Sequence, residues 1–420
     1  MYKIPFIYTP LLLILIQFIA LSLPTASFAQ EKTIEDYINI ASSNSPLLKD
    51  LKSQLFIKSL DSAIIRSNYK PQAGFNSTGT YAPVIRGYGY DEALSNGKTF
   101  NALLTVNQTL LGGGRLKNEL KGLENLSDSI SNTVLLSREE LRKNIISQYI
   151  AAYTSQKQAE IDKKVNQLLR EEDLLLKKLT QNNIYKQVDY LTFLVTLQQQ
   201  ELQMKQNGID ALNNLYLLNY LCGIVNTDSV KLAEPRLNLA AVQQQESIFL
   251  TKYRLDSIRI QNNRRSLDLN YRPKAGIYAD AGYNSSFIDQ AYKNFGASAG
   301  FTVSVPLYDG HQRKLQYNKL DIQESTRANY RDYFLKQYEQ QKSLLARQLE
   351  QQQGLFLKIN EQLRFIEGLI KVDGKLLQTG DITIADYVIA IRNYLDVQNL
   401  LKQTNGTRLQ LINQLNYWNQ

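Results

Sequence analysis

The segment Asn68-Tyr69-Lys70-Pro71-Gln72-Ala73-Gly74 occurs a second time, 202 positions later, as Asn270-Tyr271-Arg272-Pro273-Lys274-Ala275-Gly276. Each copy closes a stretch with helical periodicity and opens one with strand-like alternation, so Pro71 and Pro273 mark predicted strand starts. Further matches follow at a shift of 197 positions: 109–113 with 306–310, Asp189-Tyr190 with Asp386-Tyr387, and 218–220 with 415–417. A period of about 200 residues is too long for a solenoid unit and indicates a duplicated module of domain size.

Each module is predicted to contain a helix, a strand pair, a long helix and a return helix. The first repeat covers 30–225, with strands at about 73–85 and 99–109, and the second covers 246–420, with strands at about 275–284 and 294–306. The segment 226–245 changes character, with Glu234-Pro235 and Gln243-Gln244-Gln245, and is predicted to be a surface connector on the helical body.

Long helices are predicted because no proline interrupts about 65 residues after Gly114, a length that as one helix spans roughly 100 Å. The second module repeats this pattern from His311 to about Gln378. Apolar residues at three-and-four spacing indicate a coiled-coil-like seam. Tip turns are predicted at Asn182-Asn183 and Gly380-Asp381, followed by return helices over 188–222 and 384–417.

Residues 1–29 have the features of a secretory signal peptide: Lys3, an apolar run from Leu11 to Ala20, and Ser27-Phe28-Ala29 before Gln30. No later stretch approaches the roughly 20 uninterrupted apolar residues of a membrane helix. The only cysteine, Cys222, lies deep in the chain, which excludes an internal disulfide and an amino-terminal lipidated cysteine. The formal charge of +9 is spread without a dense basic block, so nucleic-acid binding is not predicted.

An unbroken period of two marks 295–305. One face carries Phe295, Ala297, Ala299, Phe301, Val303 and Val305, and the other Gly296, Ser298, Gly300, Thr302 and Ser304. Such runs have about the 9–11 residues that a tilted membrane strand needs, although a soluble sandwich or hairpin face gives the same alternation. Four strands cannot close a barrel, and an open edge has no place in a bilayer, so either the strands are soluble or several chains pool them.

The residues offer little for catalysis. His311 is the only histidine, so a zinc site or a histidine-based triad lacks partners. Gly112-Gly113-Gly114 lacks the lysine and hydroxyl of a Walker motif and is interpreted, with Asp309-Gly310, as a sharp turn from strand to helix. The pair Glu171-Glu172 is interpreted as a solvated helix face. No enzyme activity, metal or cofactor is predicted.

The signal peptide, the duplication, Pro306-Leu307-Tyr308-Asp309-Gly310 before a long helix, and Gly380 followed by Asp386-Tyr387 together resemble the TolC-type outer membrane efflux proteins. The resemblance implies a mainly α fold with a β-barrel portion. Three chains would each give four strands to a twelve-stranded outer-membrane barrel, which a helical tunnel continues across the periplasm.

The resemblance also implies a function. The homotrimer would be a passive exit duct of a tripartite efflux pump or type I secretion system in the outer membrane of a Gram-negative bacterium. It would contact outer-membrane lipid, a periplasmic adaptor protein and an inner-membrane pump or ABC transporter. A periplasmic adaptor or a secreted coiled-coil structural protein is the alternative.

Family members narrow the tunnel with an aspartate shortly after the tip glycine, which the resemblance places at Asp386, with Asp189 as its counterpart. A second family aspartate falls on Ile389, and the tyrosine and arginine that hold some members closed fall on Leu377 and Ile382. A ring of Asp386 carboxylates is expected to attract cations and to repel itself. Alternatively, both aspartates stabilise helix starts near the positive dipole end, the interpretation favoured for Asp189.

Overall fold

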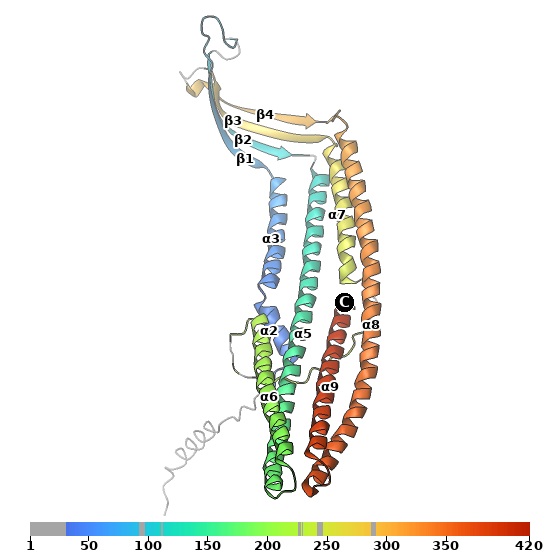
Figure 1. Cartoon of the computed structure of the whole chain (residues 1–420). Coiled ribbons are helices and arrows are strands. Elements are labelled where there is room, and N and C mark those ends of the chain that lie inside the picture. Colours follow the sequence, from blue (N-terminus) through green and yellow to red (C-terminus); the bar gives the residue numbers. More distant parts are fainter. Residues whose placement is uncertain are drawn as a thin grey trace, which may run out of the picture. The chain divides into compact units, whose positions relative to one another are not determined.

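The computed structural model describes residues 31–91, 97–110, 112–225, 228, 230–241, 247–286 and 291–420; the predicted signal peptide lies outside these ranges. Figure 1 shows the elements, which run in the order α2 (Ile34–Asn44), α3 (Pro46–Asn68), β1 (Gln72–Tyr81), β2 (Lys98–Thr109), α5 (Gly113–Gln181), α6 (Gln187–Leu221), α7 (Ile248–Asn270), β3 (Lys274–Ser285), η1 (Ala291–Asn294), β4 (Phe295–Ser304), α8 (Gln312–Thr379) and α9 (Ile384–Trp418). The predicted combination of a mainly helical chain with four strands is confirmed.

The chain forms two compact units. Of the described residues, the first unit comprises those within 31–41, 145–236 and 361–406, and the second comprises those within 42–144, 237–360 and 407–420. Before the first strand, the structure has two helices where the sequence pattern predicts one. The break lies at Ser45, whose side chain accepts a hydrogen bond from the Leu48 amide at 3.3 Å, with Pro46 opening the new helix.

The four strands form one antiparallel sheet in sequence order, β1-β2-β3-β4 (Figure 1). Its register places Phe75 opposite Leu104, Leu104 opposite Ala281, and Ala281 opposite Ala297. Because opposed residues of antiparallel strands point to the same side, most apolar residues of the four strands share one face, and Leu103 lies on the other. Phe75 is 68% exposed and Phe301 78% exposed on the shared face. Within the described residues, β1 and β4 each pair on one side only, so two edges are open.

In the second unit, asparagines set the register of α5 against α7. The side-chain amides of Asn118 and Asn125, one heptad apart, donate to the carbonyl oxygens of Asn262 and Leu255, each at 3.3 Å. Buried polar side chains of this kind fix the alignment of packed helices at a cost in stability. A separate core in the same unit joins Leu345 and Leu349 of α8 to Leu411, Ile412 and Leu415 of α9.

In the first unit, Tyr149 of α5 fixes the amino-terminal segment. Its hydroxyl lies 2.8 Å from the carbonyl oxygen of Lys32 and 2.7 Å from that of Ala233, and Lys32 forms a parallel bridge with Leu232. The described start of the predicted connector therefore lies against the helical body. None of the described helices combines the length and apolar character needed to cross a membrane.

Candidate functional site

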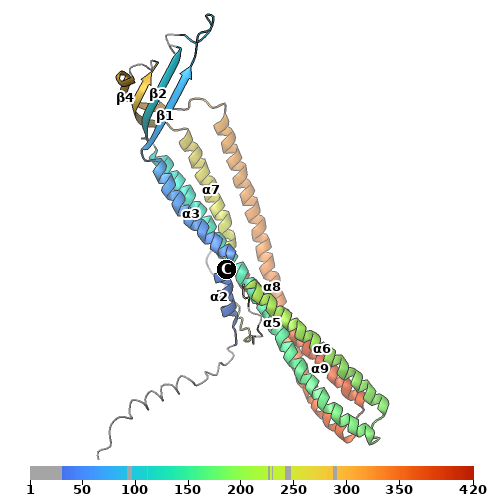
Figure 2. The same cartoon turned by 90° about the vertical axis from the view of Figure 1, so that its left-hand side faces the viewer.

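Two hairpin turns in the first unit lie side by side, one joining α5 to α6 and the other joining α8 to α9 (Figures 1 and 2). Asn183, at φ 62°, and Gly380, at φ 81°, occupy matching positions in the left-handed region. The next amide bonds back in both turns, from Ile184 to Leu179 at 3.0 Å and from Asp381 to Leu376 at 2.9 Å. Asparagine and glycine tolerate this conformation, which ends each helix with the same motif.

Asp386 lies at the third helical position of α9 and closes a capping box. Its carboxylate accepts from the Thr383 amide at 3.3 Å and from the Thr383 hydroxyl at 2.6 Å, while its own amide donates to that hydroxyl at 3.2 Å. The side chain is exposed to solvent. The geometry therefore gives Asp386 a helix-capping role, and a role in a constriction remains a prediction.

Asp189 has the matching position in α6 but no such partner. Lys186 precedes the helix where Thr383 stands in the second hairpin, and its side chain makes no capping bond. Asp189 is half-buried in the first helical turn, where a negative charge interacts favourably with the helix dipole. The two aspartates thus share a backbone position and differ in their contacts.

One apolar core lies beneath both turns and draws on four helices. Its buried members are Val165, Leu169 and Leu176 of α5, Phe193 and Leu197 of α6, Leu377 of α8, and Ile384, Tyr387, Val388 and Ile391 of α9. Leu377 belongs to this core and Ile382 packs against it. The positions that the resemblance assigned to a polar latch are therefore packing positions in this chain.

Tyr185 links the two hairpins, which the sequence pattern did not reveal. Its hydroxyl lies 2.8 Å from the carbonyl oxygen of Leu377 and 2.9 Å from that of Ile382. Burial raises the pKa of Tyr185, so the phenol is protonated and can donate at neutral pH. In the sequence, Tyr185 stands out only when the two repeats are aligned, because its counterpart in the second repeat is Ile382.

The prediction that Glu171-Glu172 forms a solvated face is wrong for Glu172. This side chain is half-buried, and its Oε2 atom is buried without a hydrogen-bond partner among the described residues. Burial is the main cause that raises the pKa of Glu172. Within the first hairpin, the Tyr190 hydroxyl donates to Asp173 at 2.9 Å. Periodicity cannot identify such contacts, because the partners lie on different helices.

The strand-to-helix turns lie in the second unit, directly beyond the sheet. A Cβ atom at Gly112 would lie 2.7 Å from the ring of Tyr69, so glycine is needed for this contact. Gly113 and Gly114 open α5. In the second turn, Gly310 has φ 63°, and the Asp309 carboxylate accepts from the Arg313 amide at 2.7 Å and from the Tyr271 hydroxyl at 2.5 Å.

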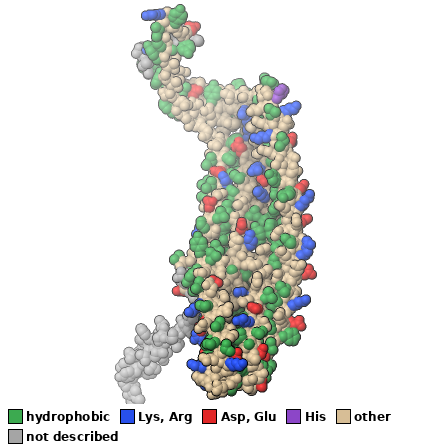
Figure 3. All heavy atoms as spheres, in the orientation of Figure 1, with side chains coloured by type: hydrophobic (Ala, Val, Ile, Leu, Met, Phe, Trp, Pro, Cys, Tyr) green, Lys and Arg blue, Asp and Glu red, His purple; other side chains and the backbone are tan. Residues whose placement is uncertain are grey.

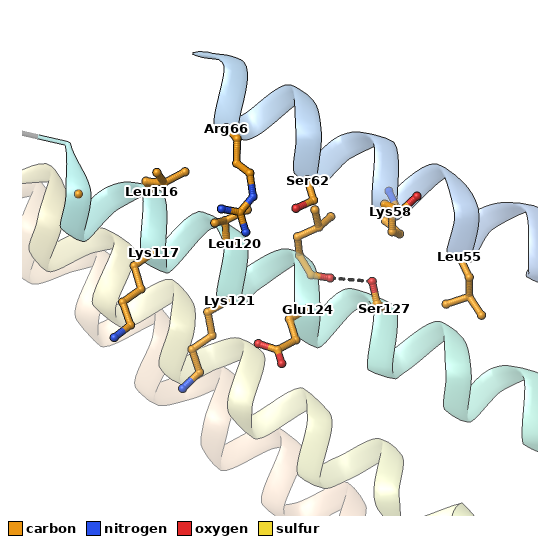
Figure 4. Close-up of a pocket in the computed structure, with 13 residues that line it drawn as sticks. Leu55, Lys58, Ser62, Arg66, Leu116, Lys117, Leu120, Lys121, Glu124 and Ser127 are labelled. Atoms are coloured by element: carbon orange, nitrogen blue, oxygen red, sulfur yellow. Dashed lines mark hydrogen bonds between the residues drawn. The ribbon is translucent and has the colours of Figure 1, made fainter. Parts of the chain in front are cut away.

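Tyr69 and Tyr271 are the tyrosines of the repeated motif that closes α3 and α7. Each contacts the neighbouring strand-to-helix turn, Tyr69 at Gly112 and Tyr271 at Asp309. Tyr69 also donates to Glu119 of α5 at 2.9 Å. Pro71 and Pro273 lie directly before β1 and β3. A groove of about 750 Å³ runs between α3 and α5, where Figure 4 shows Leu55 and Arg66 on one wall and Leu116 and Leu120 on the other.

The titratable side chains in the part of the chain that the structure describes form no metal-binding cluster. No group of three or more histidine, cysteine, aspartate or glutamate side chains there could hold a metal ion. Figure 3 shows basic and acidic side chains scattered over the visible face. Cys222 is buried, with its sulfur 3.7 Å from the Tyr37 carbonyl oxygen, and burial raises its pKa to about 11.

No family model matches the chain, and no curated protein matches its sequence. Solved structures do match. CusC aligns with a TM-score of 0.75 and 11% identity over 93% of each chain. The outer membrane protein VceC of Vibrio cholerae aligns with a TM-score of 0.73 and 14% identity, over 92% of this chain and 95% of its own.

The CmeC outer membrane channel of Campylobacter jejuni aligns with a TM-score of 0.71 and 11% identity, over 92% of this chain and 85% of its own. Nearly the whole chain takes part in each alignment. The chain therefore has the TolC-like fold of these outer membrane channels, as the resemblance in its sequence predicted.

Proposed function

We propose that this chain is the outer-membrane exit duct of a tripartite efflux pump or a type I secretion system, assembled as a homotrimer. The observation that carries the proposal is the sheet, whose apolar face and two edges are uncovered in a single chain. The shared fold with outer membrane channels supports the same assembly.

The sheet has the features of a barrel segment in a bilayer. An apolar face that is exposed along all four strands suits contact with lipid. Hydrocarbon offers no partner for unpaired strand edges, so β1 of one copy is expected to pair with β4 of the next. Aromatic side chains gather at the sheet end that is remote from the helices, among them Tyr81, Tyr283 and Phe295, as in the girdles of membrane barrels.

The opposite face suits a water-filled interior. The register aligns Thr78 with Asn101, and Thr105 with Asp280 and Ser298. Ser298 donates to the Asp280 carboxylate at 2.8 Å. Polar residues therefore alternate with the apolar ones across the sheet, and this pattern supports passage of cargo without chemical change.

The hairpin turns are the proposed docking end for a periplasmic adaptor and, through it, an inner-membrane transporter that supplies the energy. Support comes from α6, where Val188, Leu191 and Val195 follow helical spacing and are each more than half exposed beside the turn. An exposed apolar stripe on a helix surface is typical of a site that receives a partner helix.

Asp386 is the proposed constriction residue. Three exposed carboxylates around a narrow opening would attract cations and resist ionisation together. Wild-type protein in planar bilayers is expected to show conductance that added divalent or trivalent cations reduce. Asp386→Asn retains an oxygen acceptor toward Thr383 and removes the charge, so the cation effect is expected to disappear. Asp189→Asn is the matched control and is expected to behave as wild type.

An unchanged cation effect in Asp386→Asn would exclude this residue as the constriction while leaving the duct itself in place. The proposed exit duct would be contradicted if detergent-solubilised wild-type protein inserted into the planar bilayer and conducted no ions under any condition.

A further inference from the structure

Two grooves in the second unit lie between repeat-related helices and differ in how far they reach toward the sheet. The repeat relates α3 to α7 by a shift of 202 positions, and α5 to α8 by a shift of 197. The α7–α8 groove is lined by residues within 252–263 and 322–330. The α3–α5 groove continues past the matching positions to Arg66 and Gly113, next to the strands.

Beside the sheet, bonded side chains bridge α7 and α8. Asp268 of α7 accepts from the Arg313 guanidinium at 3.2 Å and from the Tyr317 hydroxyl, both on α8. One turn further from the sheet, Arg264 of α7 pairs with Asp321 of α8. These bonds join the two helices where the α7–α8 groove ends.

The counterparts in the first repeat cannot form these bonds. Arg66 stands where α7 has its bridging aspartate. Leu116 and Leu120 stand where α8 has the arginine and the tyrosine that bond to it. A cation thus replaces the acid and leucines replace its partners, so this part of the chain keeps an open groove.

Leucines line the floor of the α3–α5 groove. Leu55 of α3 and Leu116, Leu120 and Leu123 of α5 are each half-buried there. The lining runs along α5 from Gly113 to Ser127, which as helix is a length of roughly 20 Å. Half of the hydrocarbon core of a bilayer is about 15 Å thick, so an acyl chain matches a floor of this length.

Cations prevail among the charged side chains of this groove. Three of them line it without an ion pair in the part of the chain that the structure describes: Arg66, Lys117 and Lys121. Lys58 is paired with Asp61 at 2.7 Å, and Glu124 is the one acid among the described lining residues. Figure 4 shows Arg66 extending from α3 toward Leu120 of α5. A guanidinium without a carboxylate partner is well suited to bind a phosphate.

We propose that the α3–α5 groove binds one anionic phospholipid from the membrane leaflet beside the strand ends. Arg66 holds the phosphate, one acyl chain lies on the leucine floor, and the other remains in the membrane. This site rests on the proposed function, which places the sheet in the outer membrane. Arg66 lies in the last turn of α3 and β1 begins at Gln72, so the phosphate is held close to the strand ends.

A neighbouring copy of the chain has a different surface on α3 available to it. Phe56, Leu60 and Ile64 form an apolar stripe, and their side chains are 66%, 49% and 56% exposed. Leu60 lies about 130° around the helix from Leu55 and Arg66, because each residue turns an α-helix by about 100°. A helix of the next copy can cover this stripe, which leaves the groove to a smaller ligand.

The test is lipid titration of the full-length, detergent-purified protein, with bound lipids counted by native mass spectrometry. Wild type is expected to bind one phosphatidylglycerol per chain, and to bind the zwitterionic phosphatidylethanolamine more weakly. Arg66→Gln removes the charge that meets the phosphate and is expected to weaken phosphatidylglycerol binding about tenfold or more. Arg265→Gln is the matched control, because Arg265 is an exposed arginine of α7 that lines neither groove, and it is expected to bind as wild type does.

A second variant gives the first repeat the bonded arrangement of the second. Arg66→Asp combined with Leu116→Arg and Leu120→Tyr introduces the three side chains that bridge α7 and α8. This triple variant is expected to keep the wild-type helical circular dichroism and to lose phosphatidylglycerol binding. Loss of binding is thereby separated from loss of the fold.

The outcomes for the lipid site and for the exit duct are distinct. A detergent-dependent trimer that binds both lipids equally, or that loses no phosphatidylglycerol binding in Arg66→Gln, would overturn the lipid site and leave the duct in place. An equal loss in Arg265→Gln would also overturn it, because any surface cation would then suffice. A soluble monomer would contradict the duct, and titration with short-chain forms of the two lipids would still decide whether the groove selects an anionic phospholipid.

Discussion

At the scale of single residues, the repeat preserves backbone turns more faithfully than side-chain contacts. Asn183 and Gly380 end their helices in the same way, yet Thr383 and Lys186, one position before each return helix, give only one of them a capping box. Asp386 therefore has a local partner as well as a proposed role in the pore. The sequence predicted the importance of the position and left its capping role as one of two alternatives.

Replacement of Thr383 by alanine tests the capping role. Thr383→Ala removes the hydroxyl that bonds both the Asp386 carboxylate and its amide, so we expect a loss of about 1 kcal/mol in the free energy of unfolding. Thermal unfolding followed by helical circular dichroism in detergent provides the measurement. Thr383→Ser should restore most of the stability, and Lys186→Ala, at the uncapped helix, should have no effect. A loss of equal size in Lys186→Ala would count against the capping argument.

At the scale of elements, alternation and repeat together predicted four strands, and the structure has four, although the first was predicted at about 73–85 and β1 ends at Tyr81. The strand predicted at about 275–284 is β3, Lys274–Ser285, and the one predicted at about 294–306 is β4, Phe295–Ser304. A period of two depends only on neighbouring residues and the face they share, so it can be read locally.

Contacts between elements could not be read in this way. The break between α2 and α3 needed recognition of Ser45-Pro46 as a helix start, and Glu172 looked solvated because its burial arises only from the packing of α5 in the folded chain. Tyr185 likewise bonds to backbone oxygens, which leave no trace in the sequence. Such interactions depend on packing between segments about 200 residues apart.

The four-helix core beneath the turns gives a prediction at this scale. Leu176 of α5 is fully buried, whereas Leu174, two residues earlier on the same helix, is 66% exposed. Leu176→Ala is expected to lower the free energy of unfolding by about 2–5 kcal/mol, because it removes buried methyl groups and leaves a cavity. Leu174→Ala should change it by less than about 0.5 kcal/mol. Urea denaturation of both variants measures the difference, and equal effects would contradict the shared core.

At the scale of the whole molecule, the proposed exit duct depends on the two faces of the sheet. Phe301 lies on the apolar face and the adjacent Thr302 on the polar one. A lysine on a lipid-facing strand costs about 2–4 kcal/mol near the bilayer midplane, whereas a lysine toward a water-filled interior costs little. Phe301→Lys is therefore expected to reduce the amount of assembled protein in the outer-membrane fraction, and Thr302→Lys to leave it near the wild-type level. The reverse order would place the apolar face away from lipid.

The mass of the particle that the chain forms in a membrane tests directly whether three chains pool their strands. The protein, expressed with its natural amino-terminal segment, would be extracted from the outer-membrane fraction with detergent and analysed by size exclusion with mass measurement. We expect a detergent-dependent particle of three chains, in which pooled strands close the open edges of β1 and β4. A monomer that is soluble in the periplasm without detergent would contradict the pooled barrel, and with it the proposed exit duct.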